Sequence, residues 1–132
     1  ELRKGRKQSH WIWYVLPQMI GENGGWNNLY FALRSRREAV AYLKHAVLGA
    51  RYIECCQAIM GQLESGTRLI KLMGWDVDAI KLHQSLTTFY LAAVTGCLPK
   101  DTVQLLGRLL CLLGAQLRQE QLHSLLLGEE EA

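Results

Sequence analysis

The chain has 132 residues, of which 49% are hydrophobic and 20% are charged. This length suits one domain with a single core, and the composition excludes a chain that is disordered throughout. The formal net charge is +3, but residues 1–51 carry nine basic and three acidic side chains, whereas residues 52–132 carry six and nine. The basic half could attract phosphates or nucleic acid, although a solvated basic face explains the same charge.

The sequence contains no run of about eighteen apolar residues, so it predicts no membrane span. Adjacent Cys55 and Cys56 cannot readily pair, and no cysteine has the spacing of a metal ligand. We therefore expect small core cysteines in a reducing compartment, with the cytoplasm as the location, at Cys55, Cys56, Cys97 and Cys111. Because the chain begins at Glu1 without a methionine, we expect a short upstream segment to be missing.

Apolar residues recur at three-to-four spacing along nearly the whole chain, which contains only two prolines. This pattern predicts an all-α fold, a compact multihelical single domain over residues 1–132 with about six to seven helices. No alternating run is long enough to predict a strand.

The N-terminal stretch predicts two short helical pieces with a break between them. Residues 1–7 read as the end of a helix that Gly5 terminates. Ser9 is then expected to cap a helix that begins at His10. Pro17 predicts a break near residues 15–17, since proline cannot donate its backbone amide.

The next part of the chain predicts a loop, a short apolar piece and a helix. Gly21–Asn28 is rich in glycine and asparagine, which predicts a loop, and Leu29–Leu33 could be extended. Ser35 and Glu38 have the spacing of a capping box, so they predict a helix that continues to about His45.

Three further helices are expected in the middle of the chain. Apolar periodicity predicts a helix over residues 48–63 and a shorter one over Thr67–Met73, which Gly74 closes. Asp78 is expected to cap a helix over Ala79–Val94.

The C-terminal part is rich in leucine. It predicts a pair of helices, Thr102–Leu113 and Ala115–Leu127, which Asp101 caps and Gly114 separates. The leucines exceed one amphipathic stripe, so they either pack on both sides within the domain or extend into a homodimer contact. Residues 128–132 are expected to form a solvated acidic tail.

Three elements occur in family order over about residues 1–94. They read GRK–SHWIWY–PQ in residues 5–18, S–EA–AYL–H–VLG–R in residues 35–51, and KL–S–T–F in residues 81–89. These elements resemble a bacterial family of all-α domains of unknown function, often labelled calpastatin-like. The resemblance implies a compact multihelical fold and assigns no reaction or catalytic residue. The chain departs from the family at Ala46, where members often have proline.

His10 is the candidate catalytic residue, because a histidine near neutral pKa can act as a general acid or base. The alternative is a structural role, in which His10 caps or satisfies buried backbone near the break at Pro17. Trp11 and Trp13 could form a wall for a base or a sugar, or could pack in the core.

The leading functional hypothesis is a pocket near His10 for a phosphate-bearing or nucleotide-like anion, with no cofactor and no metal. That distant segments converge on it is implied by the resemblance. The expected ligand-binding residues are Arg6, Lys7, His10, Trp11, Trp13, Gln18, Lys81 and Ser85. The alternatives are a hydrolase or transferase that uses His10, and an interaction module built on the leucine-rich helices as a monomer or a homodimer. Nucleic-acid binding is not favoured, because no known motif is present.

Overall fold

The computed structural model describes residues 1–19 and 32–131, without the side chains of residues 13, 14 and 120–131. The described residues form helices and one isolated parallel bridge, between Met19 and Leu33, so the expected all-α class is confirmed for them. The prediction of about six to seven helices refers to all 132 residues, and the structure describes only part of them. The elements are η1 (Leu2–Lys4), α1 (Ile12–Val15), α3 (Arg36–Lys44), α4 (Leu48–Glu64), α5 (Leu69–Met73), α6 (Asp76–Thr95) and α7 (Lys100–Glu131).

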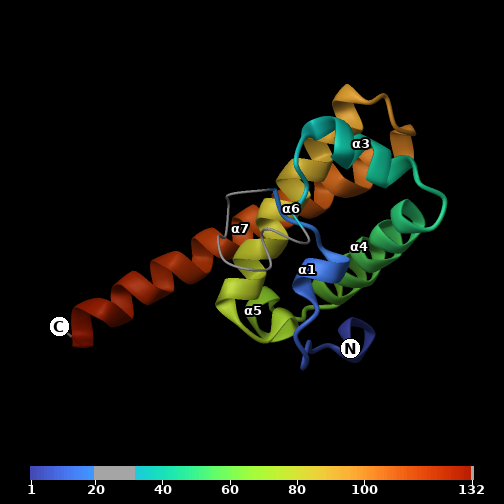
Figure 1. Cartoon of the computed structure of the whole chain (residues 1–132). Helices are drawn as coiled ribbons and strands as arrows, with labels where there is room; N and C mark the ends of the chain where they lie inside the picture. Colours follow the sequence, from blue (N-terminus) through green and yellow to red (C-terminus); the bar gives the residue numbers. More distant parts are fainter. Residues whose placement is uncertain (20–31, 132) are drawn as a thin grey trace.

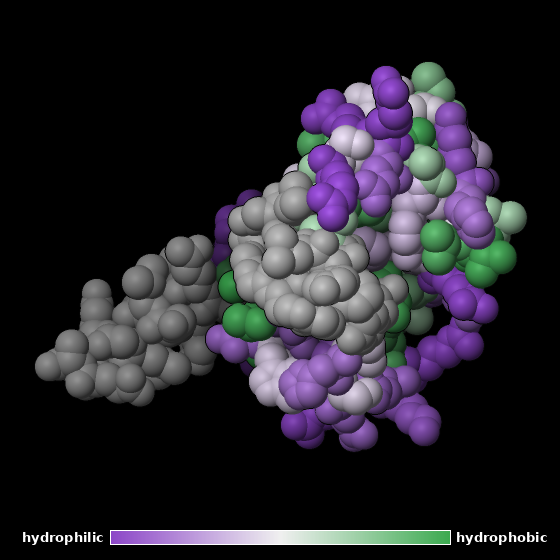
Figure 2. Space-filling model, viewed as in Figure 1, coloured by the Kyte–Doolittle hydropathy of each residue, from purple (hydrophilic) through white to green (hydrophobic). Residues whose placement is uncertain are grey.

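Helix α6 lies at the centre of the fold and packs against α3, α5, α7 and α1 (Figure 1). Its inward side chains Leu82, Leu86 and Phe89 are fully buried. The ring of Phe89 lies 4.3 Å from that of Tyr52 on α4, so aromatic packing joins α4 to α6. Hydrophobic residues form small, separate areas between hydrophilic ones on the face that Figure 2 shows.

Helix α7 is continuous from Lys100 to Glu131, so the predicted break at Gly114 is wrong. One glycine inside a helix costs only about 1 kcal/mol relative to alanine, which good helix formers on both sides of it offset. The C-terminal part of α7 extends beyond the rest of the fold (Figure 1). Although α7 is long, no helix in the described ranges has the length and apolar character needed to cross a membrane.

Several predicted helix ends are confirmed. Gly5 ends η1 with φ of 87°, and Gly74 ends α5 with φ of 82°, a backbone conformation that favours glycine. Ser35 caps α3, because its Oγ accepts a hydrogen bond from the Glu38 amide at 3.1 Å. The Glu38 carboxylate reaches back one residue further than a capping box requires, to the amide of Arg34.

Three predicted helix starts are wrong. Helix α7 begins at Lys100, so Asp101 lies in its first turn and does not cap it. Helix α1 begins at Ile12 rather than His10, because the Ser9 hydroxyl donates to the Glu1 carboxylate and does not cap a helix. Helix α6 begins at Asp76 rather than Ala79. Asp78 therefore lies inside the first turn of α6, buried, where it pairs with a distant lysine.

The cysteines are free, but only two of them lie in the interior. Cys56 is buried and Cys55 is partly buried, as expected, whereas Cys97 and Cys111 are exposed. The predicted loop over residues 21–28 lies outside the described residues, as do residues 29–31.

Candidate functional site

Lys7 is buried in a cage of one carboxylate and two indole rings. Its Nζ lies 2.7 Å from Oδ2 of Asp78 and 2.5 Å from the carbonyl oxygen of Ser9, and its side chain is 0% exposed. The same Nζ lies 5.0 Å from the ring centroid of Trp11 and 4.7 Å from that of Trp75. A carboxylate and two ring faces thus compensate its charge, which leaves no open side for a ligand.

His10 lies at the surface. Its ring stacks on that of Trp75, with centroids 4.8 Å apart and an interplanar angle of 21°. Its side chain forms no hydrogen bond to a described residue. The structure thus supplies no group within the described ranges that would orient His10 as an acid or base.

Gln18 and Ser85 are fully buried and bind to the protein itself. The side-chain amide of Gln18 donates to the carbonyl oxygens of Leu16 at 2.8 Å and of Lys81 at 2.9 Å. The Ser85 hydroxyl lies 3.0 Å from the Tyr52 hydroxyl. The N-terminal stretch and α6 therefore do meet, but these buried polar groups satisfy protein atoms rather than face a cavity.

The remaining expected ligand-binding residues are dispersed. Arg6 is exposed, and Lys81 is partly buried on α6. Trp11 is partly buried, and besides its contact with Lys7 it lines a pocket. The side chain of Trp13 lies outside the described residues.

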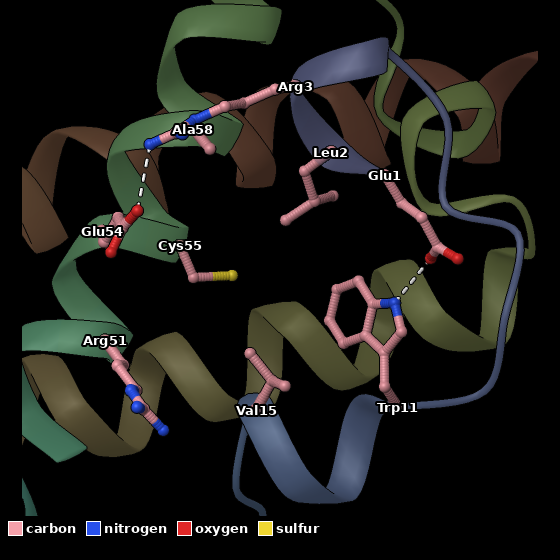
Figure 3. A pocket seen from close by; sticks show the side chains of 9 residues that line it. All are labelled: Glu1, Leu2, Arg3, Trp11, Val15, Arg51, Glu54, Cys55 and Ala58. Carbon is pink, nitrogen blue, oxygen red and sulfur yellow. Dashed lines mark hydrogen bonds and ion pairs between the residues drawn. The ribbon is translucent and has the colours of Figure 1, made fainter. Parts of the chain in front are cut away.

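A pocket of about 500 Å³ lies between η1, α1 and α4 (Figure 3). Its volume falls in the range of small-molecule sites, about 300–1,000 Å³. Four apolar side chains form one part of the lining, and charged side chains and a thiol form the rest. The lining residues are Glu1, Leu2, Arg3, Trp11, Val15, Arg51, Glu54, Cys55 and Ala58.

The indole of Trp11 is fixed in the pocket wall by Glu1. Its Nε1–H donates to Oε2 of Glu1 at 2.7 Å (Figure 3), and the Ser9 hydroxyl donates to the same carboxylate. These hydrogen bonds, that of Ser9 first, lower the pKa of Glu1 to about 2. The carboxylate therefore stays ionised at neutral pH and continues to orient the ring.

The two arginines of the pocket differ in their partners. Arg3 pairs with Glu54 at 3.0 Å, and both side chains are largely exposed. Arg51 lies one turn before Glu54 on α4, and within the described part of the chain it forms no ion pair. Arg51 therefore places a positive charge next to the apolar wall, and no described residue pairs with it.

Cys55 lines the pocket but is poorly suited to act as a nucleophile. Figure 3 shows its Sγ pointing toward the middle of the pocket. Burial first, and then the charge of Glu54, raises the pKa of the thiol to about 11. It therefore stays protonated at neutral pH, whereas the thiolate is the reactive form. The described residues contain no cluster of three or more metal-binding side chains.

Our sequence-based interpretation did not select Arg3, Arg51 or Glu54 as site residues. Residues three and four apart share a helix face, and the pocket takes residues 51, 54, 55 and 58 of α4. This spacing in the sequence indicates that the four residues share one face of a helix. It does not indicate which distant segment packs opposite that face, and Trp11 comes from such a segment.

The chain resembles a solved structure, that of the conserved hypothetical protein Rv1873 from Mycobacterium tuberculosis. The two share 34% identity with a TM-score of 0.70, over 83% of this chain and 71% of the other. The comparison with curated proteins finds no match. Residues 1–104 match the family described as "Protein of unknown function (DUF1810)", and the chain belongs to that family.

Proposed function

We propose that this chain is a small-molecule-binding domain whose pocket between η1, α1 and α4 takes a phosphate-bearing or nucleotide-like ligand. The observation that carries the proposal is the position of Arg51, a cation without an ion-pair partner in the described residues, beside an apolar wall that includes Trp11. A ligand with a ring and a phosphate has both of the groups that such a lining can hold.

The chemistry of the lining supports this ligand class. Arginine binds phosphate oxygens through charge-assisted hydrogen bonds, which are stronger than neutral ones. A base that stacks on an indole contributes about 1–3 kcal/mol. The hydrogen bond from Trp11 to Glu1 holds the ring in place before the ligand arrives, which lowers the entropic cost of binding.

Binding is favoured over catalysis in this pocket. No histidine is among the described residues that line it, and the Cys55 thiol is protonated at neutral pH. The hydrolase or transferase hypothesis needs His10, which stacks on Trp75 outside the lining. His10→Ala is therefore expected to leave ligand affinity unchanged.

Isothermal titration with AMP, GMP, CMP and UMP tests the proposal. We expect at least one of them to bind, and we expect Arg51→Ala to weaken it about tenfold or more, since hydrogen bonds to charged groups contribute about 1.5–3 kcal/mol. Arg108→Ala on α7 is the matched control, because Arg108 is exposed and does not line the pocket. Absence of binding by all four nucleotides, or equal effects of the two substitutions, would contradict the proposal.

The position of α7 favours a second candidate function, a protein-interaction module. The helix continues beyond the body of the fold (Figure 1), and the family match ends at residue 104. Its last part carries Leu122, Leu125, Leu126 and Leu127 in sequence. If this part mediates a homodimer, deletion of residues 120–132 will convert a dimer into a monomer in sedimentation velocity. A full chain that sediments as a monomer at high concentration would rule out the homodimer.

A further inference from the structure

We propose that Arg3 and Glu54 form a charge switch that makes the pocket prefer phosphomonoesters, which carry two negative charges, over singly charged phosphodiesters. In this switch Arg3 leaves Glu54 and binds the ligand phosphate together with Arg51. The inference rests on the proposed binding function, and it assigns Arg3 and Glu54 as the residues that determine specificity.

The ion pair between Arg3 and Glu54 can exchange partners because it is exposed to water. Nη2 of Arg3 lies 3.0 Å from Oε1 of Glu54, with the two side chains 75% and 63% exposed. Water screens such a pair, so its contribution to stability is small. Water can also solvate Glu54 after Arg3 has left it. A phosphate dianion, in contrast, offers a guanidinium paired, charge-assisted hydrogen bonds.

The backbone of η1 is anchored independently of the Arg3 side chain. The carbonyl oxygen of Arg3 accepts a hydrogen bond from the Gln62 side chain at 2.9 Å, and the neighbouring Leu2 is buried. The guanidinium can therefore turn from Glu54 toward the pocket while η1 remains in place. The movement needs only the rotamers of one exposed side chain.

The charge balance of the lining explains the preference. Arg51 is the arginine of the lining that no ion pair among the described residues holds, because Glu54 pairs with Arg3 and the Glu1 carboxylate accepts the hydrogen bond from Trp11. A second negative charge on the ligand requires a second cation, and Arg3 is the other arginine in the lining. Glu54 lies three residues from Arg51 on α4, so it also repels a bound anion. Its charge reaches the pocket wall, since it contributes to the raised pKa of the Cys55 thiol.

The test compares AMP with adenosine 3′,5′-cyclic monophosphate at pH 8, which differ in phosphate charge but share the base. We expect wild type to bind AMP more tightly. Glu54→Gln should tighten AMP binding about two- to fivefold, the range of an exposed ion pair, and should affect the cyclic nucleotide less. Arg3→Ala should abolish the preference for AMP. Glu64→Gln, which removes the same charge from the exposed end of α4 outside the lining, should change neither affinity.

Each contrary result has a distinct meaning. If Arg51→Ala weakens AMP binding but Glu54→Gln leaves it unchanged or weaker, the charge switch is wrong and the proposed function stands. The switch is also wrong if Arg3→Ala keeps the preference for AMP. If wild type binds neither AMP, GMP, CMP, UMP nor the cyclic nucleotide, the proposed function fails, and the switch fails with it. Circular dichroism of each variant checks that the fold is intact.

Discussion

Lys7 and Asp78, 71 positions apart in the chain, form an ion pair of 2.7 Å inside the protein. This pair fastens the N-terminal segment to the first turn of α6, and the backbone amide of Lys7 adds a hydrogen bond of 2.6 Å to the carbonyl oxygen of Leu72. The Nζ atom of Lys7 also lies 5.0 Å from the ring centroid of Trp11, so the pair contacts a residue of the pocket wall.

Lys7→Met is expected to lower the free energy of unfolding by about 3–5 kcal/mol, because it leaves the Asp78 carboxylate buried without its cation. Urea denaturation measures the change. Lys71→Met on the exposed side of α5 is the control and should cost little. The double variant Lys7→Met with Asp78→Asn should lose less than the sum of the single losses. A loss below about 1 kcal/mol for Lys7→Met would show that the buried pair is not needed for stability.

Two glycines of α4 should respond in opposite directions to alanine. A Cβ atom at Gly49 would collide with the carbonyl oxygen of Leu43, whereas one at Gly61 would meet no atom within 4 Å. We expect Gly49→Ala to destabilise the protein by about 2 kcal/mol or more through overpacking. Gly61→Ala should stabilise it by about 0.5–1 kcal/mol, since alanine is the better helix former. Thermal unfolding of both variants checks this. Equal shifts in melting temperature would contradict the close approach of Gly49 to the Leu43 carbonyl oxygen.

The Cys55 thiol should react slowly with iodoacetamide up to high pH. Its pKa is raised from the ordinary 9.0 to about 11, so at pH 9 it should react about fifty times more slowly than an ordinary thiol. A background of Cys97→Ser and Cys111→Ser removes the exposed cysteines, and peptide mapping identifies the alkylated residue. Glu54→Gln should shift the midpoint of the rate profile only partly toward 9, because burial is the larger cause. A wild-type midpoint near 9 would show that Cys55 is not desolvated.

The raised pKa of the Cys55 thiol also makes the protein less stable at alkaline pH. The folded protein holds the Cys55 proton more tightly than the unfolded chain does. The contribution of this thiol to the free energy of unfolding is therefore fully present below pH 9, and it is lost as the pH rises from about 9 to 11. Cys55→Ser should reduce this loss in alkaline urea denaturation. If Cys55→Ser loses as much free energy of unfolding as wild type over this pH range, groups other than Cys55 cause the loss.

Features that depend on a few neighbouring residues could be predicted from the sequence alone. Helical periodicity predicted the all-α class, Ser35 and Glu38 predicted the start of α3, and Gly5 and Gly74 predicted the ends of η1 and α5. Capping hydrogen bonds and glycine conformations form within one turn of the chain, so the local residue types are enough to specify them.

Packing between distant segments determines which chemically active side chains line a pocket, and the sequence alone does not show this. Lys7, Gln18 and Ser85 belong to types that often bind ligands, yet each is buried on protein atoms. The type of a residue limits the partners that its side chain can bind. Packing between distant segments then determines which of these partners it contacts. The sequence thus supplied the cations and the indole, and the meeting of η1, α1 and α4 decided that Arg51 and Trp11 share a pocket.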